Sequence, residues 1–177
     1  MSQHQAFPEL GHDHESCVAD ALAKAEVYCQ KQEARFTSQR RRILEIIWRS
    51  HKPVGAYDIL EILNADSTRK AAPMTIYRAL DFLMEHGLVH RLASQNAYLG
   101  CNHPNVVHNS YFLICSNCGR AGEMEDDSIE EAIRISALQN GFRVENQLVE
   151  VEGLCPACGP SSVSYTHLRA HETREDL

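Results

Sequence analysis

The sequence predicts an α+β fold, in which an N-terminal winged helix-turn-helix domain is followed by a small α/β domain. Helical segments and then a hairpin fill the first half, and strand-like segments flank one helix in the second. The charge divides in the same way. Residues 31–91 hold 11 Lys and Arg against 7 Asp and Glu, for +4, whereas residues 121–152 hold 2 against 9, for −7. Opposite signs indicate two domains with different roles.

Four amphipathic helices are expected in the first half, because apolar residues recur there at helical spacing. The second helix follows Thr37 and ends before Pro53, and the fourth runs from about Met74 to His86, closed by Gly87. The apolar faces comprise Val18, Leu22, Ala25 and Cys29 in the first, Ile43, Leu44, Ile46 and Ile47 in the second, Ala56, Ile59, Leu60 and Leu63 in the third, and Ile76, Leu80 and Leu83 in the fourth.

A hairpin is expected behind the fourth helix. Residues 88–92 and 97–99 flank a polar turn at residues 94–96. Helices followed by such a hairpin are typical of a winged helix-turn-helix, whose recognition helix enters the major groove of DNA.

The start of the fourth helix is the candidate DNA-binding element. Thr75, Tyr77 and Arg78 would face the DNA, and the guanidinium of Arg78 can bond guanine O6 and N7 together. Tyr57 and Arg40 are candidates for contacts that position the protein. A solvated basic face is the alternative, which the hairpin makes less favoured.

The second half is expected to begin with a strand over residues 111–115 and an acidic strand near residues 122–125. A helix over residues 128–140 would start at a capping box, Ser128 with Glu131, and a strand region over residues 142–152 would follow. The expected boundaries are a disordered segment at 1–15, the winged-helix domain at 16–100, a hinge at 101–110, the α/β domain at 111–160, and a disordered or non-native tail at 161–177.

Two Cys-x-x-Cys pairs are the strongest chemical signal. Cys115 and Cys118 with Cys155 and Cys158 can form a tetrahedral four-thiolate zinc site, which would tie the end of the domain to its beginning. Buried apolar cysteines or a redox pair are the alternatives, but two matched pairs make them less favoured.

A second set of possible metal ligands lies around the hinge. His90, Cys101, His103, His108 and Glu123 offer nitrogen, sulfur and oxygen donors that suit Zn²⁺. Such a site would join one domain to the next, as a sensor requires. Spacing alone leaves a polar linker with incidental histidines equally open.

Other classes of protein are not favoured. The longest apolar run, residues 111–115, is far too short for a membrane span, and no signal peptide follows Met1. Seven cysteines without a secretory signal fit metal ligands better than disulfides. We find no deaminase, metalloprotease, phosphate-loop or nucleophile-elbow motif. A cytoplasmic protein that is not an enzyme is expected.

Longer motifs resemble the ferric uptake regulator family over about residues 17–159. They are Arg35-Phe36-Thr37-Ser38-Gln39-Arg40-Arg41, Ala56-Tyr57-Asp58-Ile59-Leu60, the run from Met74 to Leu83, and Phe112-Leu113-Ile114-Cys115 with the closing cysteine pair. Within that family Tyr98-Leu99-Gly100-Cys101 and the following His103 resemble the zinc uptake regulator branch. Val107-His108-Asn109-Ser110 stands where iron-sensing members carry a histidine-rich stretch.

The resemblance implies a homodimeric, zinc-responsive repressor, with the α/β domain as its dimerisation domain. It implies two Zn²⁺ per subunit, a structural one on the four paired cysteines and a regulatory one on His90, Cys101, His108 and Glu123, with His103 outside the shell. The implied partner is a palindromic DNA operator before zinc-uptake genes, with no membrane. Alternatives are a family sensor of iron, manganese, nickel or peroxide and, more remotely, a zinc-ribbon interaction or thiol redox protein.

Overall fold

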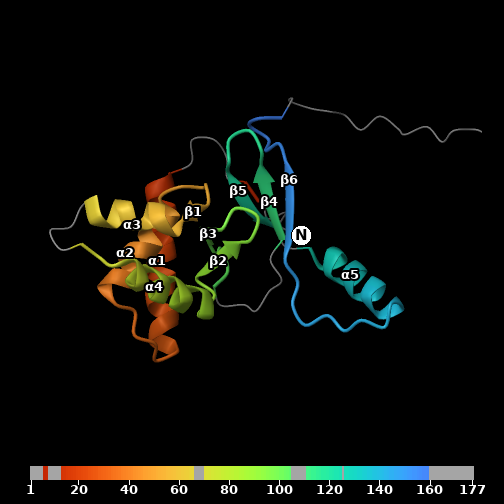
Figure 1. Ribbon diagram of the computed structural model, residues 1–177, viewed down its shortest axis with the longest axis horizontal. Coiled ribbons are helices and arrows are strands. Elements are labelled where there is room, and N and C mark those ends of the chain that lie inside the picture. The colour runs from red at the N-terminus through yellow and green to blue at the C-terminus, as the bar shows by residue number, and fades with distance from the viewer. Residues whose placement is uncertain (1–5, 8–12, 66–69, 105–110, 125, 160–177) are drawn as a thin grey trace, which may run out of the picture.

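The expected α+β class is confirmed by the structure, a computed structural model that describes residues 6–7, 13–65, 70–104, 111–124 and 126–159 (Figure 1). The elements in chain order are α1 (His14–Lys31), α2 (Ser38–Trp48), β1 (Val54–Gly55), α3 (Ala56–Ala65), α4 (Pro73–Glu85), β2 (Val89–Leu92), β3 (Ala97–Gly100), β4 (Tyr111–Cys115), β5 (Ala121–Met124), α5 (Asp127–Gln139) and β6 (Val149–Gly153).

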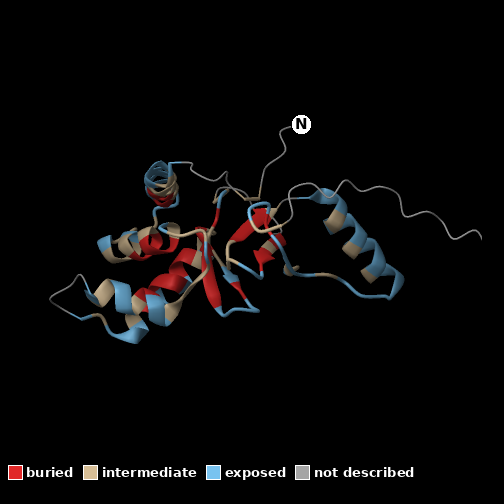
Figure 2. Cartoon of the chain, turned by 90° about the horizontal axis from the view of Figure 1, so that it is seen from above, coloured by how far each residue is buried: buried red, intermediate tan, exposed pale blue. Residues whose placement is uncertain are grey.

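Helices α1 to α4 pack around one apolar core, as their predicted faces require (Figure 2). Thr37 caps α2 by accepting a hydrogen bond from the N–H of Arg40 at 3.3 Å. Gly87 follows α4 with a φ of 61°, a conformation that costs a glycine little. The four predicted helices are therefore confirmed. Most residues of their predicted faces are buried, whereas Val18, Ala56, Leu60 and Leu63 are partly buried against the same core.

The wing is a three-stranded antiparallel sheet in the order β1-β3-β2. The predicted hairpin is its β2–β3 pair. Strand β1 was not predicted, and it adds to the other edge by pairing Val54 with Tyr98 and Gly55 with Ala97. Two residues are too few to give the alternation that identifies a strand from sequence.

The second sheet has the order β5-β4-β6, with β4 antiparallel to β5 and parallel to β6. Helix α5 lies in the connection between β5 and β6, stands apart from both sheets and contains no buried residue (Figures 1 and 2). The last strand is shorter than expected, since residues 142–148 form no strand.

The predicted capping box of this helix is wrong. Helix α5 begins at Asp127, and the side chain of Asp126 caps it by accepting from the N–H of Ser128 at 2.8 Å. The carboxylate of Glu131 pairs instead with Arg134, at 2.6 Å. An acidic residue two positions earlier is an equally good cap, and Arg134 on the next turn competes for Glu131.

The two ends of the chain differ from the expected boundaries or lie outside the described residues. Helix α1 begins at His14, inside the segment 1–15 that was expected to be disordered, because Asp13 caps it through the N–H groups of Glu15 and Ser16. The tail expected at 161–177 lies outside the described residues. Across the described part of the chain, no helix is long and apolar enough to cross a membrane.

The wing packs directly on the second sheet. Leu92 and Leu99 from the wing form a buried cluster with Phe112, Ile114 and Ala121 from β4 and β5. A backbone hydrogen bond from the N–H of Ala121 to the carbonyl of His51, at 2.9 Å, adds a second contact. The two halves of the chain therefore meet at the wing.

Candidate metal centres and DNA-binding face

The four paired cysteines lie together at the far end of β4. Their sulfur atoms are all within 4.8 Å of one another, and Cys118 Sγ is 3.7 Å from Cys155 Sγ. Cys115 ends β4, while Cys155 follows the parallel strand β6, so the sheet brings the two pairs to one place. Sulfurs around a tetrahedral zinc lie about 3.8 Å apart, so this group fits Zn²⁺.

Hydrogen bonds prepare one of these thiols for a metal. The N–H of Cys155 donates to Cys115 Sγ at 3.4 Å, and this bond, helped by a second from Cys118, lowers the pKa of Cys115 to about 6. A hydrogen bond from Asn117 lowers the pKa of Cys158, but Cys155, burial and the other thiols outweigh it and raise it to about 11. A bound dication would supply the positive charge that four neighbouring thiolates need.

A second group of donors joins the wing to the second sheet. His90 lies on β2, Cys101 directly follows β3, and Glu123 lies on β5. One nitrogen, one sulfur and one oxygen from these residues all lie within 4.8 Å of one another. His90 Nε2 is 3.0 Å from Glu123 Oε1, and the His90 ring also lies 5.3 Å from that of Phe112.

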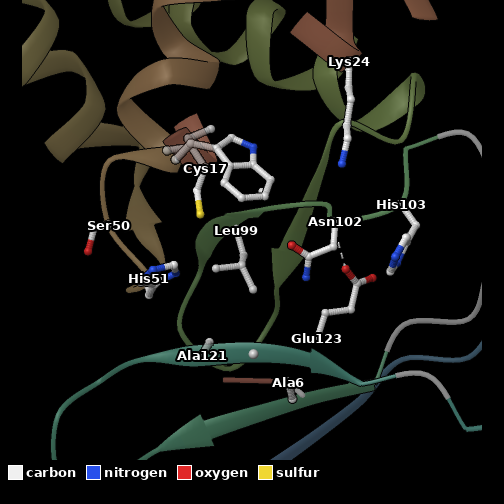
Figure 3. A pocket seen from close by; sticks show the side chains of 14 residues that line it. Ala6, Cys17, Lys24, Ser50, His51, Leu99, Asn102, His103, Ala121 and Glu123 are labelled. Carbon is white, nitrogen blue, oxygen red and sulfur yellow. Dashed lines mark hydrogen bonds between the residues drawn. The ribbon is translucent and has the colours of Figure 1, made fainter. Parts of the chain in front are cut away.

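Burial makes this group a suitable place for a cation. The side chain of Glu123 is 2% exposed, and Cys101 is buried beside it. The N–H of Asn102 donates to Glu123 Oε2 at 3.2 Å, a bond drawn in Figure 3. A buried carboxylate is costly unless it is paired and hydrogen-bonded. Mixed nitrogen, sulfur and oxygen donors, with this carboxylate among them, suit Zn²⁺.

The hinge contains two further histidines, of which the structure describes only His103. His108 lies outside the described residues, so its place as fourth ligand stays a prediction. His103 lines a cavity of about 310 Å³ that Glu123, Asn102 and Lys24 also border (Figure 3). Among the described side chains it does not join the close group of three donors.

The start of α4 presents the expected DNA-binding side chains. Tyr77 and Arg78 are exposed, Thr75 is half-buried, and Tyr57 at the start of α3 is 69% exposed. Ile76, Leu80 and Leu83 on the opposite face are buried, as predicted. Within the described part of the chain, Arg78 forms no ion pair, so its guanidinium is available to a partner.

Arg40 differs from the other DNA-binding candidates. Its guanidinium lies 3.5 Å above the ring of Phe82 and donates to the backbone carbonyl of Arg35. These contacts hold the start of α2 against α4. The structure therefore gives Arg40 an intramolecular role that the sequence analysis did not anticipate.

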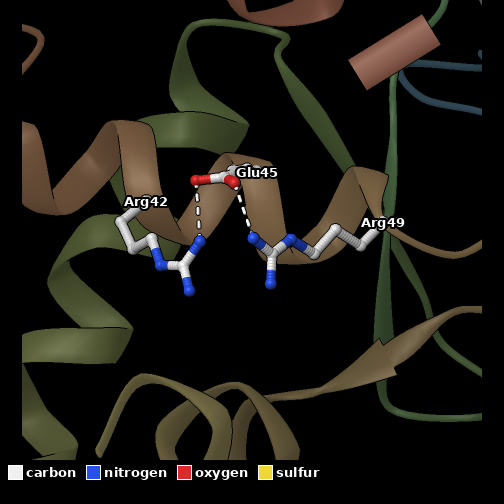
Figure 4. Close-up of polar contacts among 3 residues, drawn as sticks. All are labelled: Arg42, Glu45 and Arg49. Carbon is white, nitrogen blue, oxygen red and sulfur yellow. Dashed lines mark hydrogen bonds and ion pairs between the residues drawn. The ribbon is translucent and has the colours of Figure 1, made fainter. Parts of the chain in front are cut away.

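The other arginines of α2 are paired with carboxylates. Arg42 and Arg49 both bind Glu45, at 2.8 and 2.9 Å (Figure 4), and Arg41 binds Glu26 at 2.7 Å. The hydrogen bond from Arg42, with that from Arg49, outweighs burial and lowers the pKa of Glu45. The +4 counted for residues 31–91 already includes Glu45, and the pair with Glu26, which lies outside that range, neutralises one further charge.

Two features of the candidate sites were missed from the sequence. Met74, 62% exposed at the start of α4, lies beside Tyr77 and Arg78, where an apolar side chain suits a thymine methyl group. Its exposure could have been inferred from its helical offset to Ile76 and Leu80. The bond from Asn102 to Glu123 uses a backbone N–H, which no residue type reveals.

Comparisons with known proteins point to one family. The sequence model described as "Ferric uptake regulator family" matches residues 31–152. The zinc uptake regulation protein of Escherichia coli K12 is 36% identical over 140 residues, which are 78% of this chain and 81% of that protein.

Two solved structures are similar over most of their length. A zinc uptake regulator complexed with zinc and DNA has a TM-score of 0.73 and 35% identity, and the match covers 79% of this chain and 93% of that one. Holo XcZur has a TM-score of 0.70 and 39% identity, with 78% and 96% covered.

Proposed function

Because the chain belongs to the ferric uptake regulator family, we propose that it is a zinc-responsive transcriptional repressor whose zinc-loaded homodimer binds palindromic operators of zinc-uptake genes. The observation that carries the proposal is the group of His90, Cys101 and Glu123, whose donors come from both halves of the chain. The protein's work is then binding, with no catalytic step.

The regulatory site would act through the orientation of the wing. Zinc bound there supplies a cross-link between donors of the wing and of β5. Only three residues separate the end of α4 from the start of β2, which carries His90. A wing fixed against the second sheet therefore fixes the recognition helix as well, and a ligand that favours this arrangement shifts the population towards it.

A second zinc ion is proposed for the four cysteines, which makes two per subunit. Their proposed role is structural, because they would tie the segment after β6 to the end of β4. Four thiolates would also fill all four coordination positions of the zinc, so that no position is open to another ligand. The regulatory shell has three described donors, and His108 is the proposed fourth.

The proposed DNA contact is made by the N-terminal turns of α4. Thr75, Tyr77 and Arg78 are on the turns with which the recognition helix of a helix-turn-helix meets base edges, and Tyr57 at the start of α3 is exposed as well. Of the five candidates named from sequence, Arg40 has the least support, because its guanidinium is engaged with Phe82 and Arg35.

The proposed dimer interface lies on α5 and the segment that follows it. Leu138 is 58% exposed and Phe142 is 65% exposed, and an open apolar groove of about 650 Å³ runs between α5 and residues 142–149. Exposed apolar surface of this kind is typical of a protein–protein interface. Burial against a second copy would cover a helix that has no buried residue within the subunit.

Zinc is favoured as the signal by the thiolate of Cys101. Manganese sites are built mainly from carboxylates and imidazoles, whereas thiolate ligands select softer ions such as zinc. The buried sulfur within reach of His90 and Glu123 is therefore a specific argument for zinc.

The experiment that tests this function is an operator-binding titration against buffered free zinc. Gel shifts with a palindromic DNA selected from random sequence should be strong with zinc and weak with chelator, iron or manganese. Equal binding with all three metals would contradict a zinc-specific sensor. Binding that requires no metal would contradict regulation by metal altogether.

A further inference from the structure

A glutamate outside both metal groups also joins the wing to the second sheet. Glu150 on β6 accepts hydrogen bonds from two backbone N–H groups of the wing turn, from Ala93 at 2.6 Å and from Ser94 at 3.1 Å. The two carboxylate oxygens take one bond each. These residues are 56 and 57 positions apart in the sequence, so only the docking of the wing on the sheet brings them together.

The strand register places this contact in line with the regulatory site. Phe112 on β4 pairs with Glu123 on β5 and with Glu150 on β6. Residues paired across neighbouring strands point to the same side of a sheet. Glu123, Phe112 and Glu150 therefore form one row across the three strands, and the wing lies along this row, with His90 at one end and the turn at the other.

Attachment at both edges of the sheet restricts the wing more than either contact does alone. Strands β5 and β6 are the two edges of the sheet, and the cluster of Leu92, Leu99 and Phe112 lies between them. A single contact at one edge leaves the wing free to pivot about it, whereas a second at the other edge opposes this rotation.

The contact is one that a carboxylate makes well. Burial raises the pKa of Glu150, but hydrogen bonds from Ser94 and Ala93 outweigh it and lower the pKa overall, so the group is ionised at neutral pH. Bonds from N–H groups to an ionised carboxylate are roughly twice as strong as neutral ones. None of the three residues belongs to the metal groups, so this attachment does not need a metal.

We propose that Glu150 is a positioning residue, which holds the tip of the wing on the second sheet without metal and so sets the zinc concentration at which the operator is bound. The proposal rests on the function proposed above. When Glu150 already holds the tip of the wing, zinc binding at the other end of the row has to remove less conformational freedom from the wing. Without Glu150, zinc binding must also provide that ordering, so more zinc is required.

The test compares Glu150→Ala with Glu152→Ala in the full-length protein. Glu152 lies two residues along the same strand, is exposed and accepts no bond from the wing, so its variant loses the same charge. The first measurement is hydrogen exchange at the amides of Ala93 and Ser94 in protein that keeps zinc on the four cysteines and has none at the regulatory site. Exchange there should accelerate in Glu150→Ala and stay unchanged in Glu152→Ala.

The second measurement is operator binding against buffered free zinc. The zinc concentration for half-maximal binding should rise about tenfold in Glu150→Ala, the equivalent of one charge-assisted hydrogen bond, and should not change in Glu152→Ala. Glu150→Gln keeps one acceptor oxygen and should give an intermediate shift. Metal content and melting temperature should match the parent, which separates a positioning role from a loss of fold.

Two outcomes would overturn the proposal. Unchanged amide exchange in Glu150→Ala would mean that the carboxylate does not hold the turn. Faster exchange with an unaltered zinc dependence would mean that the contact has no part in regulation. If the parent protein itself binds no operator in response to zinc, the proposed function fails and the regulatory role falls with it, whereas the exchange experiment still decides the attachment.

Discussion

The carboxylate of Glu123 is buried between an imidazole and a backbone N–H group, inside the contact between wing and sheet. It is the only buried charged residue in the described part of the chain. A charge in such a place either finds a counter-charge or destabilises the fold. The imidazole of His90 lies within hydrogen-bond distance of this carboxylate, and a bound dication would supply the counter-charge.

The thiol of Cys101 is the residue that most sharply tests the regulatory site. Replacement by serine removes the soft donor but keeps the size of the side chain, so Cys101→Ser should lose zinc-dependent operator binding and remain a folded dimer. Gel shifts with and without chelator measure the first effect. Cys17→Ser, in the half-buried face of α1, is the matched control, and zinc-dependent shifts equal to the parent's in Cys101→Ser would refute the assignment.

The guanidinium of Arg78 should contribute base recognition. Arg78→Ala is expected to cost about 1–3 kcal/mol of binding free energy on the operator and much less on unrelated DNA. The variant loses a base contact on the operator, whereas on unrelated DNA it loses only one positive charge. Competition titrations with both DNAs measure the difference. Arg49→Ala is the control, because it removes the same charge from an arginine that is already paired with Glu45. If Arg78→Ala weakens binding to both DNAs equally, Arg78 contacts a phosphate and not a base.

Much of the candidate site, but not all of it, could be predicted from residue types. The four paired cysteines could be predicted from spacing, since two such pairs have few other uses. Residue types also named His90, Cys101, His103, His108 and Glu123 as possible ligands, but spacing alone left a polar linker equally open, and the family resemblance was needed to select the set. Glu150 was not predicted at all, since its partners are backbone N–H groups, which every residue type except proline carries.

At the level of elements, periodic segments were predictable and short or unpaired ones were not. The helices from α1 to α4 each bury one face, which produces a clear pattern of apolar residues. Helix α5 also has a helical pattern of apolar residues, but its start was misplaced because Asp126 and Ser128 are both good N-caps. Strand β1 has two residues and depends wholly on its pairing with β3.

The end of β3 meets α2 with no space to spare. A Cβ atom at Gly100 would overlap the indole ring of Trp48. Gly100→Ala should therefore force the two elements apart and lower stability by roughly 1–3 kcal/mol. Thermal unfolding measures the loss. Gly153→Ala, at the end of β6 with open space around it, is the control, and an equal melting temperature for the two variants would contradict the predicted overlap.

The cysteine pairs bring sulfur atoms of the end of β4 and of the segment after β6 into one group, which the proposed structural zinc would hold together. Cys118→Ser should remove one of four metal bonds and lose much of the stability of the second sheet, because metal binding and folding are coupled in such sites. A melting curve with metal content measured alongside gives the result. An unchanged melting temperature in this variant would argue against a structural role.

For the whole molecule, the net charge of −7 conceals two halves of opposite sign. The positive half has a modest net charge of +4, and Arg41, Arg42 and Arg49 are held by carboxylates within the chain. Weak nonspecific attraction to DNA follows from this. Operator recognition must then depend on how well two recognition helices match successive major grooves, about 34 Å apart in a dimer.

The proposed dimer would form through the exposed face of α5. Leu138→Glu places a charge at the proposed interface, so it should weaken the dimer by at least tenfold and weaken operator binding with it. Sedimentation equilibrium measures the dimer. Val27→Glu on α1, an equally exposed apolar position in the other half, is the control. A Leu138→Glu protein as dimeric as the parent would place the interface elsewhere.

The contact between Trp48 and Gly100 also gives the protein an optical probe of its own. The chain contains one tryptophan, and its indole borders both the cavity lined by Glu123 and the neighbouring one lined by Cys101. Indole emission responds to the polarity and packing around the ring. Its intensity and wavelength therefore report events at these two ligands in the unlabelled protein, in real time and without a background from any other tryptophan.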